Sequence, residues 1–149
     1  MIWYIKEMRN IKRFYGLASL ASLGTGMGIY FFFRNTNMLL FEWMPKFIIF
    51  NNVYIPINHS ILSSMLLYNL PDMLWFLSGI LFLRYLWFNN KQWQGIYVIC
   101  FYGIAIIIET SQLFTNIPGT FDWLDLSFMG IGAFVEGLLY NNFVRRRIV

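Results

Sequence analysis

The sequence predicts an all-α integral membrane protein: one domain over residues 1–149, with four transmembrane helices in a small bundle. Composition is the first reason, because 58% of the residues are hydrophobic and only 12% are charged, whereas soluble domains carry about 25% charged residues. The second reason is that four apolar stretches come close to the roughly 20 residues that cross about 30 Å of hydrocarbon. These stretches are 14–33, 71–88, 94–114 and 123–140.

The direction of the spans follows from Lys and Arg near their ends. Basic residues within 6–13 precede the first span, Lys91 lies between the second and third spans, and the arginines at 145–147 follow the fourth. These regions share one side if both termini are cytoplasmic, and the opposite side then has only Arg34 and Lys46. The basic residues form no stripe with aromatic residues between them, so the net charge of +4 does not indicate a nucleic-acid partner.

The connection between the first two spans, residues 34–70, is too long for a turn and too interrupted for a further span. We expect it to lie in the membrane interface on the outer side. Within it, Ser60 is placed to cap a short helix over residues 61–69. Pro71 is then expected to end that helix and to open the second span.

Acidic side chains converge at the outer boundary of this topology. Glu109 and Gln112 come late in the third span, three residues apart and therefore on one helix face. Asp122 and Asp125 open the fourth span with the same spacing, and Asp72 opens the second. Because successive spans run in opposite directions, these side chains are predicted to reach one level in the membrane.

Two interpretations compete for these acids. Asp72, Asp122 and Asp125 stand in first turns, where a carboxylate caps free backbone N–H groups or suits the helix dipole. Glu109 does not fit that interpretation, because it lies near the C-terminal end of its helix. An ionisable residue at membrane depth costs about 2.5–3.5 kcal/mol on insertion scales and usually faces a bundle interior or a cavity. We therefore expect Glu109 to face Asp125 in a ligand-binding pocket or polar network, with Gln112 and Asp72 at its edge and Arg34 as the nearest strong base. Asp122, the first residue of the helix signal, is expected to act more as a cap than as a binding residue.

A second set of polar residues lies toward the inner side. Arg84 and Glu136 are each four residues from the predicted inner end of their span, so they have equal depth. A structural ion pair between them is one interpretation, and snorkelling of Arg84 to the interface is the other. Glycines in the first and fourth spans are expected to let helices approach closely: Gly24, Gly26, Gly28, Gly130 and Gly132.

The order of these features resembles the VanZ-like family of small bacterial membrane proteins. That family shows a Glu and a Gln three apart late in one helix, a short loop, and an Arg-x-x-Asp-x-x-Asp-x-x-x-Asn-x-x-Gly run opening the next helix. The matching residues here are Glu109, Gln112, Asp122, Asp125 and Gly132, with Asp72 at the place of an earlier family aspartate.

This chain departs from the family pattern at its polar and basic positions. Gly119 stands at the place of the family Arg and Met129 at that of the Asn, while Met73 and Trp75 or Phe76 replace the Lys and His that commonly follow the first Asp. The resemblance implies a location in the bacterial cytoplasmic (inner) membrane and a role at the cell envelope. The family's namesake is linked to resistance toward the glycopeptide teicoplanin.

Three functions remain open. The first is binding of an envelope lipid or a glycopeptide-like ligand, with antibiotic resistance as one outcome. The second is that of a non-catalytic subunit of a larger membrane complex. The third is a membrane enzyme with a carboxylate or Mg²⁺ or Ca²⁺ site, for which the carboxylates and the Gln112 amide are suitable oxygen ligands. The sequence contains no HExxH, CxxC or nucleophile-elbow motif, so it names no catalytic residue, dedicated metal site or cofactor.

Overall fold

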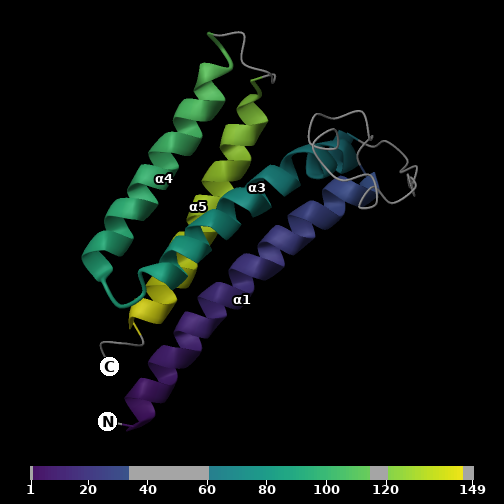
Figure 1. The fold of residues 1–149 in the computed structure, drawn as a ribbon. Coiled ribbons are helices and arrows are strands. Elements are labelled where there is room, and N and C mark those ends of the chain that lie inside the picture. Colours follow the sequence, from purple (N-terminus) through teal and green to yellow (C-terminus); the bar gives the residue numbers. More distant parts are fainter. Residues whose placement is uncertain (1, 34–60, 115–120, 146–149) are drawn as a thin grey trace, which may run out of the picture.

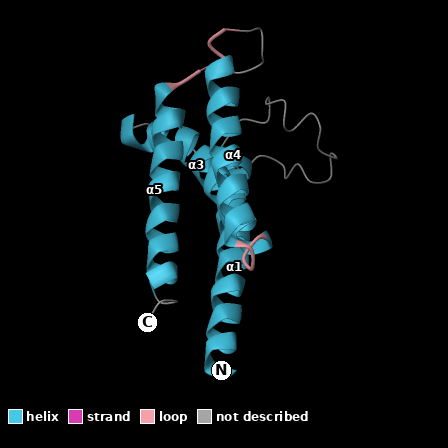
Figure 2. Ribbon diagram, turned by 90° about the vertical axis from the view of Figure 1, so that its left-hand side faces the viewer, coloured by secondary structure: helices cyan, strands magenta, loops and turns pink. Residues whose placement is uncertain are grey.

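The structure, a computed structural model, describes residues 2–33, 61–114 and 121–145. In these residues it contains helices and no strand: α1 (Ile2–Phe33), α3 (Ile61–Leu86), α4 (Lys91–Ser111) and α5 (Trp123–Arg145) (Figures 1 and 2). Each of the four helices is long and apolar enough to cross a membrane. The predicted all-α membrane fold is therefore confirmed, while Arg34 and most of the predicted interfacial segment lie outside the described residues.

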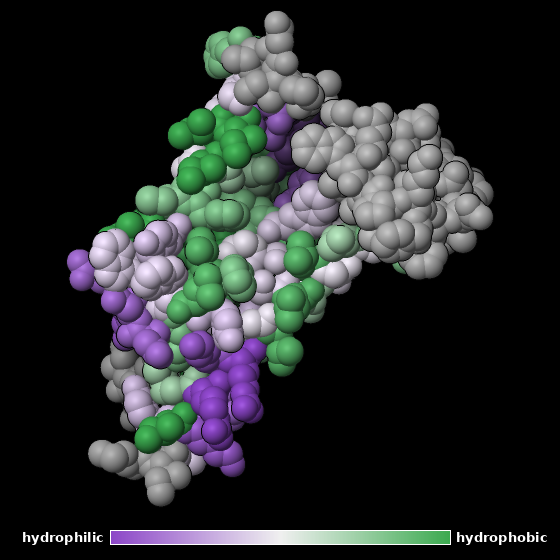
Figure 3. Space-filling view, in the orientation of Figure 1, coloured by the Kyte–Doolittle hydropathy of each residue, from purple (hydrophilic) through white to green (hydrophobic). Residues whose placement is uncertain are grey.

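Helix α1 begins at Ile2 and therefore includes the basic residues that precede the predicted span at residue 14. Its 32 residues correspond to about 48 Å at the helical rise, which exceeds the roughly 30 Å of a hydrocarbon core. Figure 3 shows hydrophilic surface at the lower end of the molecule, where α1 begins. The first turns of α1 thus extend the membrane span into the polar interface.

Helix α3 runs without interruption from Ile61 to Leu86 and contains Pro71 in its interior. The expectation that Pro71 ends a separate short helix is wrong. Proline removes one helical hydrogen bond, but membrane helices tolerate it where neighbouring groups compensate. Pro71 is fully buried in the bundle, so packing contacts surround the position at which the sequence predicts a break.

Helix α3 is the central element, packed against α1, α4 and α5. The start of α1, the end of α3, the start of α4 and the end of α5 lie together at the lower end of Figure 1. We call this the terminal end of the bundle and the opposite one the distal end.

The contact between α1 and α3 depends on close approach and hydrogen bonds. The hydroxyl of Ser19 donates to the carbonyl of Ser78 at 3.0 Å, and the Ser78 hydroxyl donates to the Ser19 carbonyl at 3.0 Å. Gly16 leaves room for the ring of Tyr85, because a Cβ atom at Gly16 would lie 3.2 Å from that ring. In lipid, such contacts hold helices together better than apolar burial does, since the surrounding chains are equally apolar.

Side-chain caps begin the two remaining helices. The Asn90 side chain accepts a hydrogen bond from the backbone N–H of Trp93 at 3.3 Å, which starts α4 after a short turn. At the distal end, the Asp122 carboxylate accepts from the backbone N–H of Leu124 at 2.9 Å and starts α5. Each cap satisfies a donor that has no partner within its own helix.

Candidate functional site

One stripe of α4 faces the rest of the bundle. Its buried residues are Gln94, Val98 and Glu109, and the half-buried Tyr102 and Ala105 fall between them. Spacings of three and four residues place all five on the same helix face. Helix α4 therefore turns a polar residue inward near each end and apolar residues inward between them.

A cleft of about 490 Å³ opens at the distal end, with walls from all four described helices. Figure 3 shows a recess of hydrophilic side chains near the upper end of the molecule, beside a more hydrophobic surface. Its volume lies in the range of pockets that bind small ligands, roughly 300–1,000 Å³. The cleft is lined by Tyr30, Asp72, Trp75, Phe76, Phe101, Ala105, Ile108, Glu109, Gln112, Asp125 and Met129.

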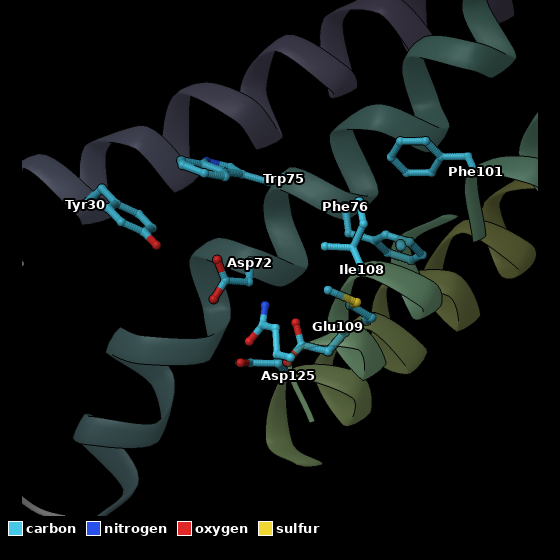
Figure 4. A pocket seen from close by; sticks show the side chains of 11 residues that line it. Tyr30, Asp72, Trp75, Phe76, Phe101, Ile108, Glu109 and Asp125 are labelled. Carbon is cyan, nitrogen blue, oxygen red and sulfur yellow. The ribbon is translucent and has the colours of Figure 1, made fainter. Parts of the chain in front are cut away.

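Four predicted site residues meet in this cleft. Asp72 comes from α3, Glu109 from α4 and Asp125 from the first turn of α5. Gln112 is the residue that caps the end of α4. Figure 4 shows the side chains of Asp72, Glu109 and Asp125 in the same part of the cleft. The structure thus brings three carboxylates and one amide from three helices to the lining of one cleft.

Glu109 is the most enclosed of these residues, with 6% of its surface exposed. The backbone of Asp122 donates a hydrogen bond to its carboxylate. Oxygen Oε1 is buried and has no hydrogen-bond partner within the part of the chain that the structure describes. A buried acceptor left in this way costs about 1–3 kcal/mol, and more when it is charged, so it marks a position at which an added donor would be stabilising.

Asp122 has a different place from the other acids. It is exposed, caps α5, and does not line the cleft. Its backbone links the start of α5 to Glu109, so its contribution is to position the end of α4 against α5. Arg34, the predicted basic neighbour, lies outside the described residues.

The model of the VanZ/LLP1 family matches residues 8–145. The chain belongs to the VanZ/LLP1 family. No curated protein and no solved structure matches it.

The cleft of this VanZ/LLP1-family protein has an aromatic wall that the sequence did not predict. Trp75 and Tyr30 stack with ring centroids 4.9 Å apart and planes at 16°. Gly26 makes this possible, because a Cβ atom there would lie 2.6 Å from Cδ1 of Trp75. The repeated glycines of the first span signal such a close approach, but Gly24 and Gly28 have open space in the same position.

The deeper part of the cleft is apolar. Phe76 stacks on Phe101 at 5.6 Å and on Tyr102 at 5.5 Å. The ring of Phe101 lies over Gly79, so that a Cβ atom at Gly79 would overlap it. Gly132 of α5 packs against Met73 and Phe76 in the same region. These rings form an aromatic layer, defined here as Phe76, Phe101 and Tyr102, that closes the cleft toward the terminal end.

A polar network occupies the bundle on the other side of this layer. Nε of Arg84 lies 2.7 Å from Oε1 of Glu136, and the Tyr102 hydroxyl donates to Oε2 of Glu136 at 3.0 Å. Gln94 accepts from Nη1 of Arg84 at 3.3 Å and donates to the Arg84 carbonyl at 2.9 Å. The guanidinium also lies over the ring of Tyr140, 3.9 Å from its centroid.

Gln94 and Tyr102 are the members of this network that sequence reasoning missed. Gln94 follows the cap of α4 by one turn and therefore returns to the depth of Arg84, a signal that chain order alone could have given. Tyr102 carried no such signal, because its role depends on which face of α4 meets α5. In the described residues, those of the cleft included, no three Asp, Glu, His or Cys side chains come close enough to hold a metal ion.

Proposed function

We propose that this VanZ/LLP1-family protein acts at the cell envelope by binding a ligand in its distal cleft. The candidate ligands are the polar part of an envelope lipid and a glycopeptide-like compound, the latter giving resistance of the teicoplanin type. The observation that carries the proposal is Oε1 of Glu109, which is buried beside a 490 Å³ cleft without a partner among the described residues. The ion pair with Arg84 accounts for Glu136, and the cap at Leu124 accounts for Asp122, but no such contact accounts for this oxygen.

The orientation we propose has both termini in the cytoplasm. The first turns of α1 and α4, at the terminal end of the bundle, carry five basic residues: Lys6, Arg9, Lys12, Arg13 and Lys91. Lys and Arg accumulate on the cytoplasmic side of membrane proteins. The cleft then opens at the extracytoplasmic boundary, where envelope lipids and external compounds are both within reach.

Topology can be measured in intact cells after Cys100 is replaced by Ser. A cysteine replacing Asn116, in the connection between α4 and α5, should react with an impermeant thiol reagent added outside. A cysteine replacing Asn90, in the turn before α4, should remain unlabelled until the cells are opened. Labelling of Asn90→Cys alone would place the cleft in the cytoplasm and contradict an envelope ligand.

Three partners could compensate Glu109: a ligand donor, Arg34, or a proton shared with Asp125. Carboxylates brought together in a low dielectric do not all stay ionised without such a partner. An Arg34→Gln variant separates the second case, because loss of an internal ion pair should destabilise the protein. If ligand compensates Glu109, Arg34→Gln should leave stability and ligand retention unchanged.

The central experiment is mass spectrometry of the lipids and other compounds retained by the full chain in mild detergent. Wild type should retain a compound that Glu109→Gln loses while the variant still inserts and folds. Glu7→Gln is the matched control, since it makes the same substitution in the first turns of α1. Equal retention by Glu109→Gln and wild type would reject the cleft as the binding site, and copurification of a stoichiometric protein would favour the complex-subunit alternative.

A further inference from the structure

The cleft is polar at its mouth and apolar in its depth. Its acids and Gln112 lie at the distal end, whereas Phe101, Ala105 and Met129 lie farther toward the middle of the bundle. Glu109 and Phe101 are eight positions apart on α4, which corresponds to about 12 Å along the helix axis. In Figure 4, Phe101 lies on the side of the cleft away from Asp72, Glu109 and Asp125.

The polar mouth offers acceptors to a ligand and few donors. Carboxylates of Asp72, Glu109 and Asp125 line it, the uncharged donors of its lining outside Trp75 are the Tyr30 hydroxyl and the Gln112 amide, and no Lys, Arg or His is among the described lining residues. The indole nitrogen of Trp75 is buried against Gly26, where a Cβ atom would lie 2.7 Å from it, and so it faces α1 instead of the acids. A ligand that fits this mouth must therefore supply hydrogen-bond donors and positive charge itself.

We infer that the ligand is an amphiphile with a primary ammonium group, which binds Glu109 together with Asp125 and Asp72. Its apolar part extends along Ala105 and Met129 to the aromatic layer. This inference rests on the proposed function and specifies the class of ligand. An ammonium group is a compact cation with three donors, which suits acids that converge from three helices.

A primary ammonium is favoured over other cations by the orphan oxygen. Oε1 of Glu109 is buried and needs a donor, and a quaternary ammonium has the charge but no N–H group. Quaternary ammonium ions are instead recognised by cages of aromatic ring faces, and here one face of Trp75 and one face of Tyr30 are occupied by their stacking on each other. The site should therefore distinguish two cations of equal charge by their ability to donate.

The apolar half has a separate role. A chain that leaves lipid for the cleft gains no hydrophobic energy, because both environments are apolar, so a membrane ligand must be selected by its head group. The apolar half then only has to fit the chain. Phe101, held over Gly79, sets how deep that chain reaches.

Head-group selection can be tested with lipids of identical acyl chains. The full chain is purified in mild detergent with an equimolar mixture of phosphatidylethanolamine, phosphatidylcholine and phosphatidylglycerol, and the retained lipids are counted by mass spectrometry. Wild type and Glu7→Gln should enrich the ethanolamine lipid at least about tenfold over both others, the ratio that 1.4 kcal/mol of selective binding produces. Glu109→Gln and Asp125→Asn should lower that enrichment toward equality, with helix content by circular dichroism confirming that each variant is folded.

The source of the ammonium group is distinguished by competition. Dodecylammonium should displace bound phosphatidylethanolamine, whereas dodecanol, with the same chain and no charge, should not. Binding of dodecylammonium without enrichment of the ethanolamine lipid would support a free cationic amphiphile as the ligand. If the protein retains a compound through Glu109 but shows no preference for primary amines, this inference is overturned and the proposed function stands. If no compound is retained through Glu109, both are overturned.

The depth of the cleft allows an independent test of where the apolar chain of the ligand lies. Across a series of alkylammonium probes, affinity measured against the free aqueous concentration should rise about fourfold for each buried methylene until the chain meets Phe101. Phe101→Ala should move that limit to longer chains. Phe82→Ala is the control, because Phe82 belongs to α3 but is exposed on the outside of the bundle, and an equal shift in both variants would contradict the chain placement.

Discussion

The distal cleft and the polar network each contain a buried glutamate, but only the glutamate of the network has a hydrogen-bond partner for both of its oxygens among the described residues. Each has a buried glutamate facing the centre of the bundle, 6% exposed for Glu109 and 2% exposed for Glu136. Glu136 has a partner for each oxygen, Arg84 on Oε1 and Tyr102 on Oε2. Glu109 is left with one oxygen that nothing in the described chain satisfies.

Whether both carboxylate oxygens have partners distinguishes a structural glutamate from a ligand-binding one better than the residue type does. A buried charge with complete partners contributes to holding three helices in register, and its removal leaves the partner uncompensated. A buried acceptor beside a cleft costs stability in the ligand-free protein and is stabilised only when a donor arrives. The following changes test the comparison from its largest expected effect to its smallest.

The largest effect is expected at Arg84. Arg84→Gln should lower the free energy of unfolding by about 3–5 kcal/mol, because Glu136 is then buried without its counter-ion. Glu136→Gln should also destabilise, and the double variant should cost clearly less than the sum of the two. The measurement is unfolding of the protein in detergent, followed by circular dichroism, and additive effects would show that the 2.7 Å pair contributes no coupling.

The aromatic layer between the two regions should be the next most sensitive position. Gly79→Ala places a methyl group into the ring of Phe101, and overpacking of this kind costs about 1–3 kcal/mol. Gly103→Ala is a matched control on α4, since a Cβ atom there has nothing within 4 Å. The same unfolding assay should find Gly103→Ala neutral or stabilising, and equal losses at both glycines would contradict the tight packing at Gly79.

A smaller effect is expected at the cap of α5. Asp122→Ala removes the acceptor for the Leu124 N–H and should cost about 1 kcal/mol, whereas Asp122→Asn should cost little because asparagine caps equally well. Ligand retention should survive in Asp122→Asn. Loss of retention in that variant, with stability unchanged, would show that the Asp122 carboxylate contacts the ligand.

The smallest change in stability is expected at Glu109 itself. Glu109→Gln should unfold no more easily than wild type without ligand, because the substitution removes a buried carboxylate whose Oε1 has no described partner. Retention of ligand, in contrast, should be lost. A destabilisation as large as that of Arg84→Gln would mean that Glu109 is held by an internal partner, and the contrast between the two regions would disappear.

Much of this site could be predicted from spacing. Glu109 and Gln112 share a face because they are three apart, and both reach the cleft. The depth argument that paired Arg84 with Glu136 corresponds to a contact of 2.7 Å. Chain order also favours Asp122 as the cap, because it is the first residue of the helix signal, and Asp125 as the residue in the pocket. In the structure Asp122 caps the N–H of Leu124, and Asp125 lines the cleft.

The sequence by itself determined that this protein lies in lipid and that its apolar stretches of spanning length are helices. It also determined that the acids lie near one end of these helices. These are local properties, because length and composition decide whether a segment can cross lipid and whether its backbone must be helical. Tertiary structure alone decided that α3 continues through Pro71, that Gly26 but not Gly24 or Gly28 lies under Trp75, and that Glu109 keeps an unpartnered oxygen among the described residues. Each of these depends on which faces of distant helices meet, and periodicity within one helix carries no information about its neighbour.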